Sequence, residues 1–289
     1  MQKAPVNGVE LEYEVNGSGE PVLLIPTGPI ADSFWPFVTE DSLAGRYQLI
    51  AYHQRGQAGS TRTPPPVSFA EHAEDAAALL GYLGIGRAHI AGHSTGAVTA
   101  LQLALDYPDL AHSLALFEPP LMSVAGAPAF LEKVGPSMAT HSDGRSEEAI
   151  ADFIGVVCSL EWEECSRLID KHTPGGTAQV FRDADNVFST LLPALGEWQF
   201  GPEQAGRLAP PVLSVLGTDS ERLFKESDEM LHVWMPQVED GRVNGVAHLL
   251  HLQRPEPVVQ RVAAFFARHP MFQSELRSPT RRVRTGSSS

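Results

Sequence analysis

A serine in a glycine-flanked turn is the residue of this chain best placed for nucleophilic chemistry. The segment 92–96 reads Gly-His-Ser-Thr-Gly, which is a G-x-S-x-G pattern. It follows an apolar run at 88–91, which predicts a buried strand, and precedes a helical pattern at 97–105. A sharp strand-to-helix turn of this kind exposes a serine hydroxyl at the end of a sheet. We therefore interpret Ser94 as a nucleophile, the alternative being that it only caps the helix.

A serine hydroxyl needs a general base, because it is a poor nucleophile at its own pKa. Residues 244–251 read Asn-Gly-Val-Ala-His-Leu-Leu-His and lie just before a helical pattern at 255–268. His248 follows small residues at the tip of this loop, and we favour it as the base. His251 is the second candidate, which we interpret as a packing or capping residue.

The base needs an acid to orient it, and two carboxylates follow predicted strands. Glu118 comes directly after the apolar run 112–117 and precedes two prolines that stiffen the exit of the chain. Asp219 follows the apolar run 211–216 and lies in a Gly-Thr-Asp-Ser turn. Position alone does not separate Glu118 from Asp219.

The strands and helices that must position these residues alternate along the chain. Apolar runs, at 21–26, 47–52 and 88–91 among others, predict strands that are buried on both faces. Such alternation predicts a mostly parallel central sheet with helices on both faces. The candidate site residues then meet at the carboxyl ends of the strands.

Residues 121–207 break this alternation. They contain several amphipathic helical patterns and no strand-like run, so we predict a helical lid inserted into a core formed by residues 1–120 and 208–269. Trp198 lies in this insertion, and we predict that it lines an apolar substrate pocket above Ser94, the alternative being that it packs within the lid. The basic, polar tail at 270–289 is predicted to be disordered.

From about Val9 to Arg268 the chain resembles the α/β-hydrolase superfamily. The usual acid of that superfamily lies three residues beyond the glycine that ends its strand, which here places Ser220, and not Asp219, in that position. Some members, the zearalenone lactonases among them, are similar in carrying a glutamate after the earlier strand. The resemblance therefore favours Glu118 as the triad acid and leaves Asp219 as the alternative.

The resemblance also implies an oxyanion hole made of two backbone N–H groups. Thr95, directly after the nucleophile, supplies one of them. The loop after the strand 21–26 supplies the other, and here it reads Thr-Gly-Pro at 27–29. Pro29 has no N–H to donate, so we predict Gly28 as the donor, with Ile30 as an alternative.

The loop 53–60 is similar to the superfamily's Asp-x-Arg-Gly-x-Gly-x-Ser loop, with His53 in place of the aspartate. We interpret it as structural, with Arg55 forming a local ion pair.

No histidine–carboxylate cluster has the spacing of a metal site, and no glycine-rich loop with a lysine could cradle phosphate. We therefore expect neither a metal ion nor another cofactor.

Composition restricts the partners. A net charge of −14 in 289 residues argues against binding nucleic acid or an anionic membrane. No apolar run is long enough to span a bilayer and no signal peptide is evident, so a cytoplasmic location is expected. The only cysteines, Cys158 and Cys165, are seven residues apart, and we predict that both lie on one helix face as reduced thiols. The oligomeric state stays open.

Together these observations predict a serine hydrolase that cleaves a small or medium apolar carboxylic ester or lactone through an acyl-enzyme. Three alternatives use the same fold. The site could hydrolyse a C–C bond next to a ketone, it could serve a non-hydrolytic cyclase or dehydratase, or the protein could be a ligand-binding receptor. A complete Ser/His/acid set disfavours the receptor, because a binder has no need of it.

Overall fold

A computed structural model describes residues 1–271 of the chain. Its centre is an eight-stranded sheet with the strand order β1-β2-β4-β3-β5-β6-β7-β8. The pairings β1–β2 and β2–β4 are antiparallel, and every other pairing is parallel. The strands are β1 (Gln2–Val6), β2 (Val9–Gly17), β3 (Glu20–Ile25), β4 (Tyr47–Tyr52), β5 (Ala88–His93), β6 (Ala111–Phe117), β7 (Val212–Val215) and β8 (Glu239–Asp240).

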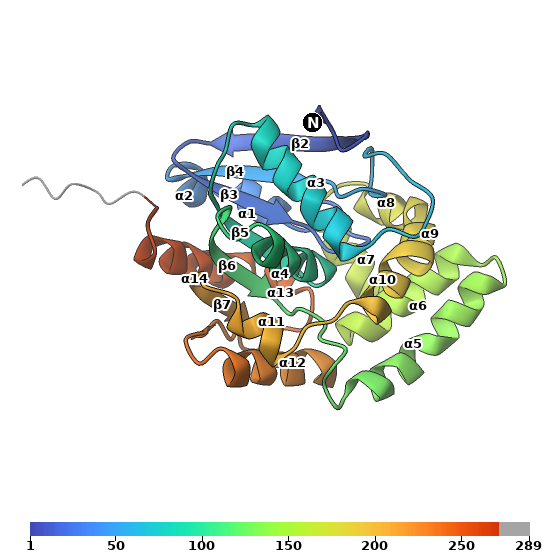
Figure 1. Cartoon of the computed structure of the whole chain (residues 1–289). Helices are drawn as coiled ribbons and strands as arrows, with labels where there is room; N and C mark the ends of the chain where they lie inside the picture. The colour runs from blue at the N-terminus through green and yellow to red at the C-terminus, as the bar shows by residue number, and fades with distance from the viewer. Residues whose placement is uncertain (272–289) are drawn as a thin grey trace, which may run out of the picture.

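Helices cover both faces of the sheet because successive side chains of the buried strands point to opposite faces. In β3, Leu23 packs into the core beneath α3, α4 and α12, whereas Leu24 packs into the core beneath α1 and α14. The predicted α/β architecture is thus confirmed (Figure 1). The helices around the sheet are α1 (Trp35–Val38), α2 (Asp41–Ala44), α3 (Phe69–Tyr82), α4 (Thr95–Asp106), α12 (Arg222–Trp234), α13 (Leu250–Gln253) and α14 (Pro255–Arg268).

Residues 121–207, which we call the helical segment, lie beside the sheet and contribute no strand to it (Figure 1). The apolar faces of these helices join the same core as α3 and α4. The helices are α5 (Ala127–Ser142), α6 (Ser146–Cys158), α7 (Trp162–His172), α8 (Gly176–Arg182), α9 (Ala184–Asn186), the π-helix η1 (Val187–Leu191), α10 (Leu192–Glu197) and α11 (Pro202–Gly206).

The prediction that both cysteines share one helix face is wrong. Ser159 has a left-handed backbone conformation with φ of 54°, so α6 ends at Cys158 and Cys165 belongs to α7. Both thiols are nevertheless free and buried.

Most of the tail predicted to be disordered, from residue 272 onward, lies outside the described residues. Within residues 1–271, none of the helices combines the length and hydrophobicity required of a transmembrane span.

Candidate active site

Ser94 lies in the sharp turn between β5 and α4 that the sequence predicts. Its backbone has φ 54° and ψ −120°, a conformation that is costly for a residue with a side chain. The turn is anchored to the sheet by the Ser94 N–H, which donates to the Phe117 carbonyl at 2.8 Å. A β-carbon at Gly92 would lie 2.3 Å from the Gly96 carbonyl oxygen, so this position of the turn accepts only glycine.

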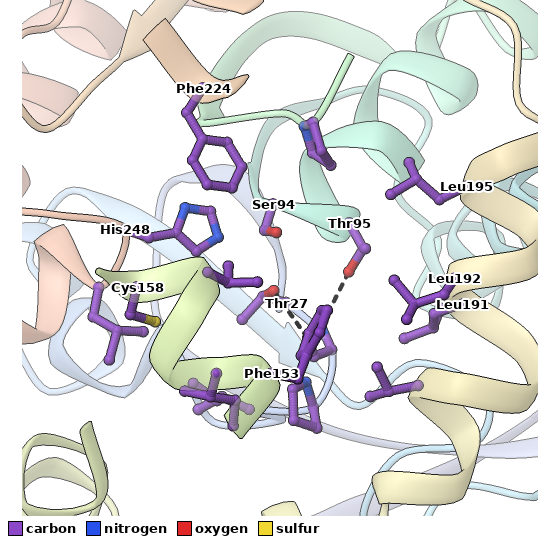
Figure 2. Close-up of a pocket in the computed structure, with 18 of the residues that line it drawn as sticks. Thr27, Ser94, Thr95, Phe153, Cys158, Leu191, Leu192, Leu195, Phe224 and His248 are labelled. Atoms are coloured by element: carbon purple, nitrogen blue, oxygen red, sulfur yellow. Dashed lines mark hydrogen bonds between the residues drawn. The ribbon is translucent and has the colours of Figure 1, made fainter. Parts of the chain in front are cut away.

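His248 lines the same cavity as Ser94. Figure 2 shows both side chains among those that line this cavity. One ring nitrogen, Nδ1, is 2.6 Å from Oε2 of Glu118. The other, Nε2, is buried and has no hydrogen-bond partner among the described residues. Nε2 is therefore free to accept a proton.

Glu118 is the carboxylate that the structure brings to His248. It directly follows β6, has a positive φ of 48° and carries a fully buried side chain. Its second oxygen, Oε1, accepts hydrogen bonds from the Gly217 N–H at 2.7 Å and from the Ser220 hydroxyl at 2.5 Å. With His248 as the third donor, the carboxylate is held as an acceptor in one orientation.

Asp219, the alternative acid, is exposed and, among the described residues, makes no hydrogen bond to His248. Its Oδ1 accepts a hydrogen bond from the Thr218 hydroxyl at 3.1 Å, as a turn residue would. Ser220, which occupies the usual acid position, instead contributes its hydroxyl to Glu118. The structure thus brings Ser94, His248 and Glu118 together and leaves Asp219 outside.

Two further histidines, His93 and His251, pack against His248, and no pattern in the sequence predicted a role for His93. The His93 ring lies 4.7 Å from that of His248, and its Nε2 donates to the His248 carbonyl at 3.0 Å. Burial, with the neighbouring His251 and His248, holds the pKa of His93 well below its ordinary value, so the ring stays neutral. Burial likewise lowers the pKa of His251 to about 3, and its ring stacks on Phe34. His251 is thus a packing residue, as we interpreted it.

The predicted oxyanion donors lie at the edge of the same cavity. The N–H of Thr95 is in the first turn of α4, where backbone N–H groups have no partner within the helix. The N–H of Gly28 is engaged: it donates to the Thr95 hydroxyl at 3.0 Å (Figure 2). An oxyanion at this position would therefore replace the Thr95 hydroxyl as the acceptor for Gly28.

The cavity in front of Ser94 and His248 is almost entirely apolar. Its free space measures about 600 Å³, the open mouth included. Among the described residues, its lining includes no carboxylate, lysine or arginine, and its titratable side chains are His248 and the Cys158 thiol. Phe224 forms one wall and stacks on the His248 ring at a centroid distance of 4.0 Å. The helical segment contributes Phe130, Phe153, Ile154, Val157, Cys158, Val187, Leu191, Leu192 and Leu195.

The prediction that Trp198 lines this cavity is wrong. Trp198 follows the end of α10, and its indole N–H donates to Oε1 of Gln102 on the outer side of α4 at 2.9 Å. Its ring stacks on Phe200 and meets the edge of Phe69. These ring contacts join the helical segment to the core, and Trp198 is not among the residues that line the cavity.

Replacing Trp198 with alanine is therefore expected to lower stability and not to alter substrate preference. The loss of the ring contacts and of the Gln102 hydrogen bond predicts a decrease of about 2 kcal/mol in the free energy of unfolding. Urea unfolding and a comparison of kcat/KM across ester substrates measure the two effects. A changed substrate ranking at unchanged stability would contradict this placement.

The loop 53–60 is built as a structural unit. Arg55 forms a two-point ion pair with the buried Asp75, through Nε at 2.9 Å and Nη2 at 2.8 Å. His53 lies between two carboxylates: its Nδ1 is 3.0 Å from Oε2 of Glu12, and its Nε2 is 3.0 Å from Oδ1 of Asp32. Burial opposes protonation of His53, but hydrogen bonds and charge from Asp32 and Glu12 outweigh it and raise the pKa of His53 above 6.5.

This raised pKa predicts a pH-dependent contribution to stability. The contribution of His53 is fully present below the ordinary pKa of 6.5 and is lost as pH rises through the higher pKa of the folded state. The difference in unfolding free energy between the wild type and His53→Gln should therefore shrink above pH 6.5. Urea titrations at several pH values test this expectation, and a difference independent of pH would contradict it.

Part of this chain is similar in sequence to curated hydrolytic enzymes. Over 116 residues the chain is 37% identical to a putative carbamate hydrolase, RutD, from Azorhizobium caulinodans, covering 40% of this chain and 43% of the relative. It is 33% identical over 121 residues to a fluoroacetate dehalogenase from a Burkholderia species, covering 39% and 38%. The chain thus matches about two fifths of the length of these curated relatives.

The similarity to solved structures extends over nearly the whole chain. An esterase from Thermogutta terrifontis superposes with a TM-score of 0.79 at 22% identity, covering 93% of this chain and all of the other. The enol-lactonase from Burkholderia xenovorans LB400 gives 0.76 at 17% identity, covering 92% and 100%. A family profile described as alpha/beta hydrolase fold matches residues 20–255. The chain therefore belongs to the alpha/beta hydrolase fold family.

Proposed function

We propose that this protein is a serine hydrolase that cleaves a small or medium apolar carboxylic ester or lactone through an acyl-enzyme. One observation carries the proposal: Ser94 and His248 face the same apolar cavity, while Glu118 holds His248 by its Nδ1 and leaves Nε2 free. Nucleophile, base and orienting acid are the three parts that acyl transfer by a serine requires.

The reaction begins when the Ser94 hydroxyl attacks the carbonyl carbon and His248 Nε2 takes its proton. Glu118 accepts the Nδ1–H throughout and stabilises the imidazolium that forms. As the tetrahedral intermediate collapses, the C–O bond to the leaving alcohol breaks, and the Nε2 proton passes to the alkoxide. Water, deprotonated by the same nitrogen, then attacks the acyl carbon, the bond to Ser94 Oγ breaks, and the Nε2 proton returns to Oγ. In a lactone the leaving hydroxyl stays attached to the acyl group.

The oxyanion of each tetrahedral intermediate is stabilised by the N–H groups of Thr95 and Gly28. In the structure the Gly28 N–H donates to the Thr95 hydroxyl. As negative charge develops, the oxyanion is the stronger acceptor, because hydrogen bonds to an ionised oxygen are about twice as strong as neutral ones. The exchange favours the transition state over the ground state, which is the condition for catalysis.

The substrate class follows from the cavity. Its lining is apolar and holds no lysine or arginine among the described residues, so an uncharged acyl group fits and a charged one would lose its hydration without gaining a permanently charged partner. The relatives are named for different activities, on carbamates, fluoroacetate, esters and an enol-lactone, so they do not determine which bond this chain cleaves.

A panel of p-nitrophenyl esters of increasing acyl length and of lactones, assayed with the purified protein, tests the proposal. We expect steady turnover of uncharged esters or lactones, with esters that carry a carboxylate on the acyl chain turned over far more slowly. A fluorophosphonate probe should modify Ser94 alone, as read by peptide mass spectrometry. Absence of turnover across the panel would support the C–C hydrolase, non-hydrolytic or receptor alternatives.

A further inference from the structure

The loop that carries Gly28 is held in place by buried glutamines. This oxyanion loop, residues 26–31, joins β3 to the turn before α1, and three of its carbonyl oxygens accept hydrogen bonds from side-chain amides. The bonds run from Gln54 to Pro26 at 2.9 Å, from Gln57 to Thr27 at 3.1 Å and from Gln179 to Pro29 at 3.0 Å. Three separate side chains thus fix the backbone on both sides of the Gly28 N–H.

Gln179 differs from the other two because it comes from the helical segment, in α8. Its amide contacts the loop twice: Nε2 donates to the Pro29 carbonyl, and Oε1 accepts the Ala31 N–H at 3.3 Å. The backbone on either side of Ile30 is therefore tied to one side chain. Gln179 is buried, so water does not substitute for these bonds.

The amide of Gln179 is itself held in one orientation. Its Nε2 also donates to the carboxylate of Asp183, which is 1% exposed. Asp183 in turn accepts the Ala58 N–H at 2.7 Å and pairs with Arg62. An amide that already donates to a carboxylate cannot flip without losing that bond, so its oxygen stays directed at Ala31.

The helical segment touches the loop again at Gly28 itself. A β-carbon at Gly28 would lie 2.2 Å from Cδ1 of Leu191, so this side chain packs directly on the loop backbone. That contact is apolar and limits how far Gly28 can move outward, but it does not set the direction of the N–H. Among the contacts from the helical segment, the directional ones to this loop are those of Gln179.

We propose that Gln179 is a positioning residue for the oxyanion hole: from the helical segment it fixes the Pro29–Ala31 backbone and thereby aims the Gly28 N–H at the reacting carbonyl. The inference rests on the proposed function. If Gln179 has this role, the helical segment must be docked for the transition state to be stabilised. The segment then does more than form part of the cavity wall. Small displacements of an oxyanion donor are costly, since a 1 Å error in geometry can lower a rate by about 10²-fold.

Gln179→Met tests the proposal, because methionine has nearly the same shape and removes both hydrogen bonds to the loop. The matched control is Gln102→Met, which removes the bond from α4 to Trp198 and so weakens docking of the helical segment without touching the oxyanion loop. For both variants we would measure kcat and KM for an ester, the melting temperature, and inhibition by a trifluoromethyl ketone, whose adduct with Ser94 carries an oxyanion.

We expect Gln179→Met to lower kcat by between about 10- and 100-fold with KM within about twofold. Inhibition by the trifluoromethyl ketone should weaken by a similar factor. Gln102→Met should lower the melting temperature and leave kcat and inhibition nearly unchanged. Equal losses of kcat in both variants, or an unchanged kcat and inhibition in Gln179→Met, would overturn the proposal.

Should Gln179→Met fail to fold, Gln179→Asn keeps the amide but withdraws it by one methylene. It is expected to show the same parallel loss in kcat and inhibition, and normal values of both would likewise overturn the proposal. Ser94→Ala separates this inference from the proposed function. If Ser94→Ala keeps its activity, the serine mechanism fails. If Ser94→Ala loses activity while the Gln179 variants keep theirs, only the role of Gln179 fails.

Discussion

Ser94→Ala is expected to lower kcat/KM for ester hydrolysis by about 10⁴-fold or more, while the protein stays folded. The attacking atom is lost, but the cavity, the His248–Glu118 pair and the oxyanion donors remain. Alanine also fits the turn, since it keeps a side chain no larger than that of serine at φ 54°. Progress curves with a p-nitrophenyl ester measure the loss, and circular dichroism confirms the fold.

The fluorophosphonate probe supplies the control for this result. It should label the wild type once and Ser94→Ala not at all. A variant with a rate near that of the wild type, or labelling at another residue, would show that Ser94 is not the nucleophile and would remove the basis of the proposed function.

Glu118→Gln is expected to cost about 10⁴-fold in rate with the fold retained. The geometry gives the reason: Gly217 and Ser220 both donate to the Oε1 position, so the amide oxygen must stay there and the amide NH₂ must face His248. Nδ1 then becomes an acceptor, the proton moves to Nε2, and the base can no longer take the proton of Ser94. The pH–rate profile and kcat/KM measure the loss.

Asp219→Asn is the matched comparison for this prediction. Asp219 is exposed and contacts Thr218, so the hydrolysis rate of the variant should stay within about tenfold of that of the wild type. The reverse outcome, with a large loss for Asp219→Asn and a small one for Glu118→Gln, would restore the usual Ser-Asp-His arrangement and end the assignment of Glu118.

Local patterns made the fold and the centre of the site predictable. The G-x-S-x-G turn is recognisable because backbone geometry requires glycine beside Ser94, and the parallel strands β3 to β8 then all end at one edge of the sheet. The turn and the strands could be predicted because they depend on spacing within single elements, which a sequence records directly. Glu118 could be favoured over Asp219 only through the resemblance to the superfamily, whose usual acid position falls on Ser220 in this chain.

Contacts between distant elements were not predictable in the same way. Trp198 looked equally suited to a pocket or a core, and only the packing of α10 against α4 decides that its indole reaches Gln102. Gln179 lies far along the chain from the loop it holds, and an isolated glutamine in an amphipathic helix carries no signal of such a role. The two cysteines were misplaced because a single left-handed residue, Ser159, ends α6 between them.

The apolar lining of the cavity also affects release of the carboxylic acid product. Hydrolysis of an uncharged ester yields a carboxylic acid that ionises in water near pH 4. Inside the cavity the new anion would meet apolar walls and the buried carboxylate of Glu118 behind His248, with no lysine or arginine among the described lining residues. The lining that accepts a neutral substrate therefore disfavours the charged product, so that departure of the acid is driven by its own hydration.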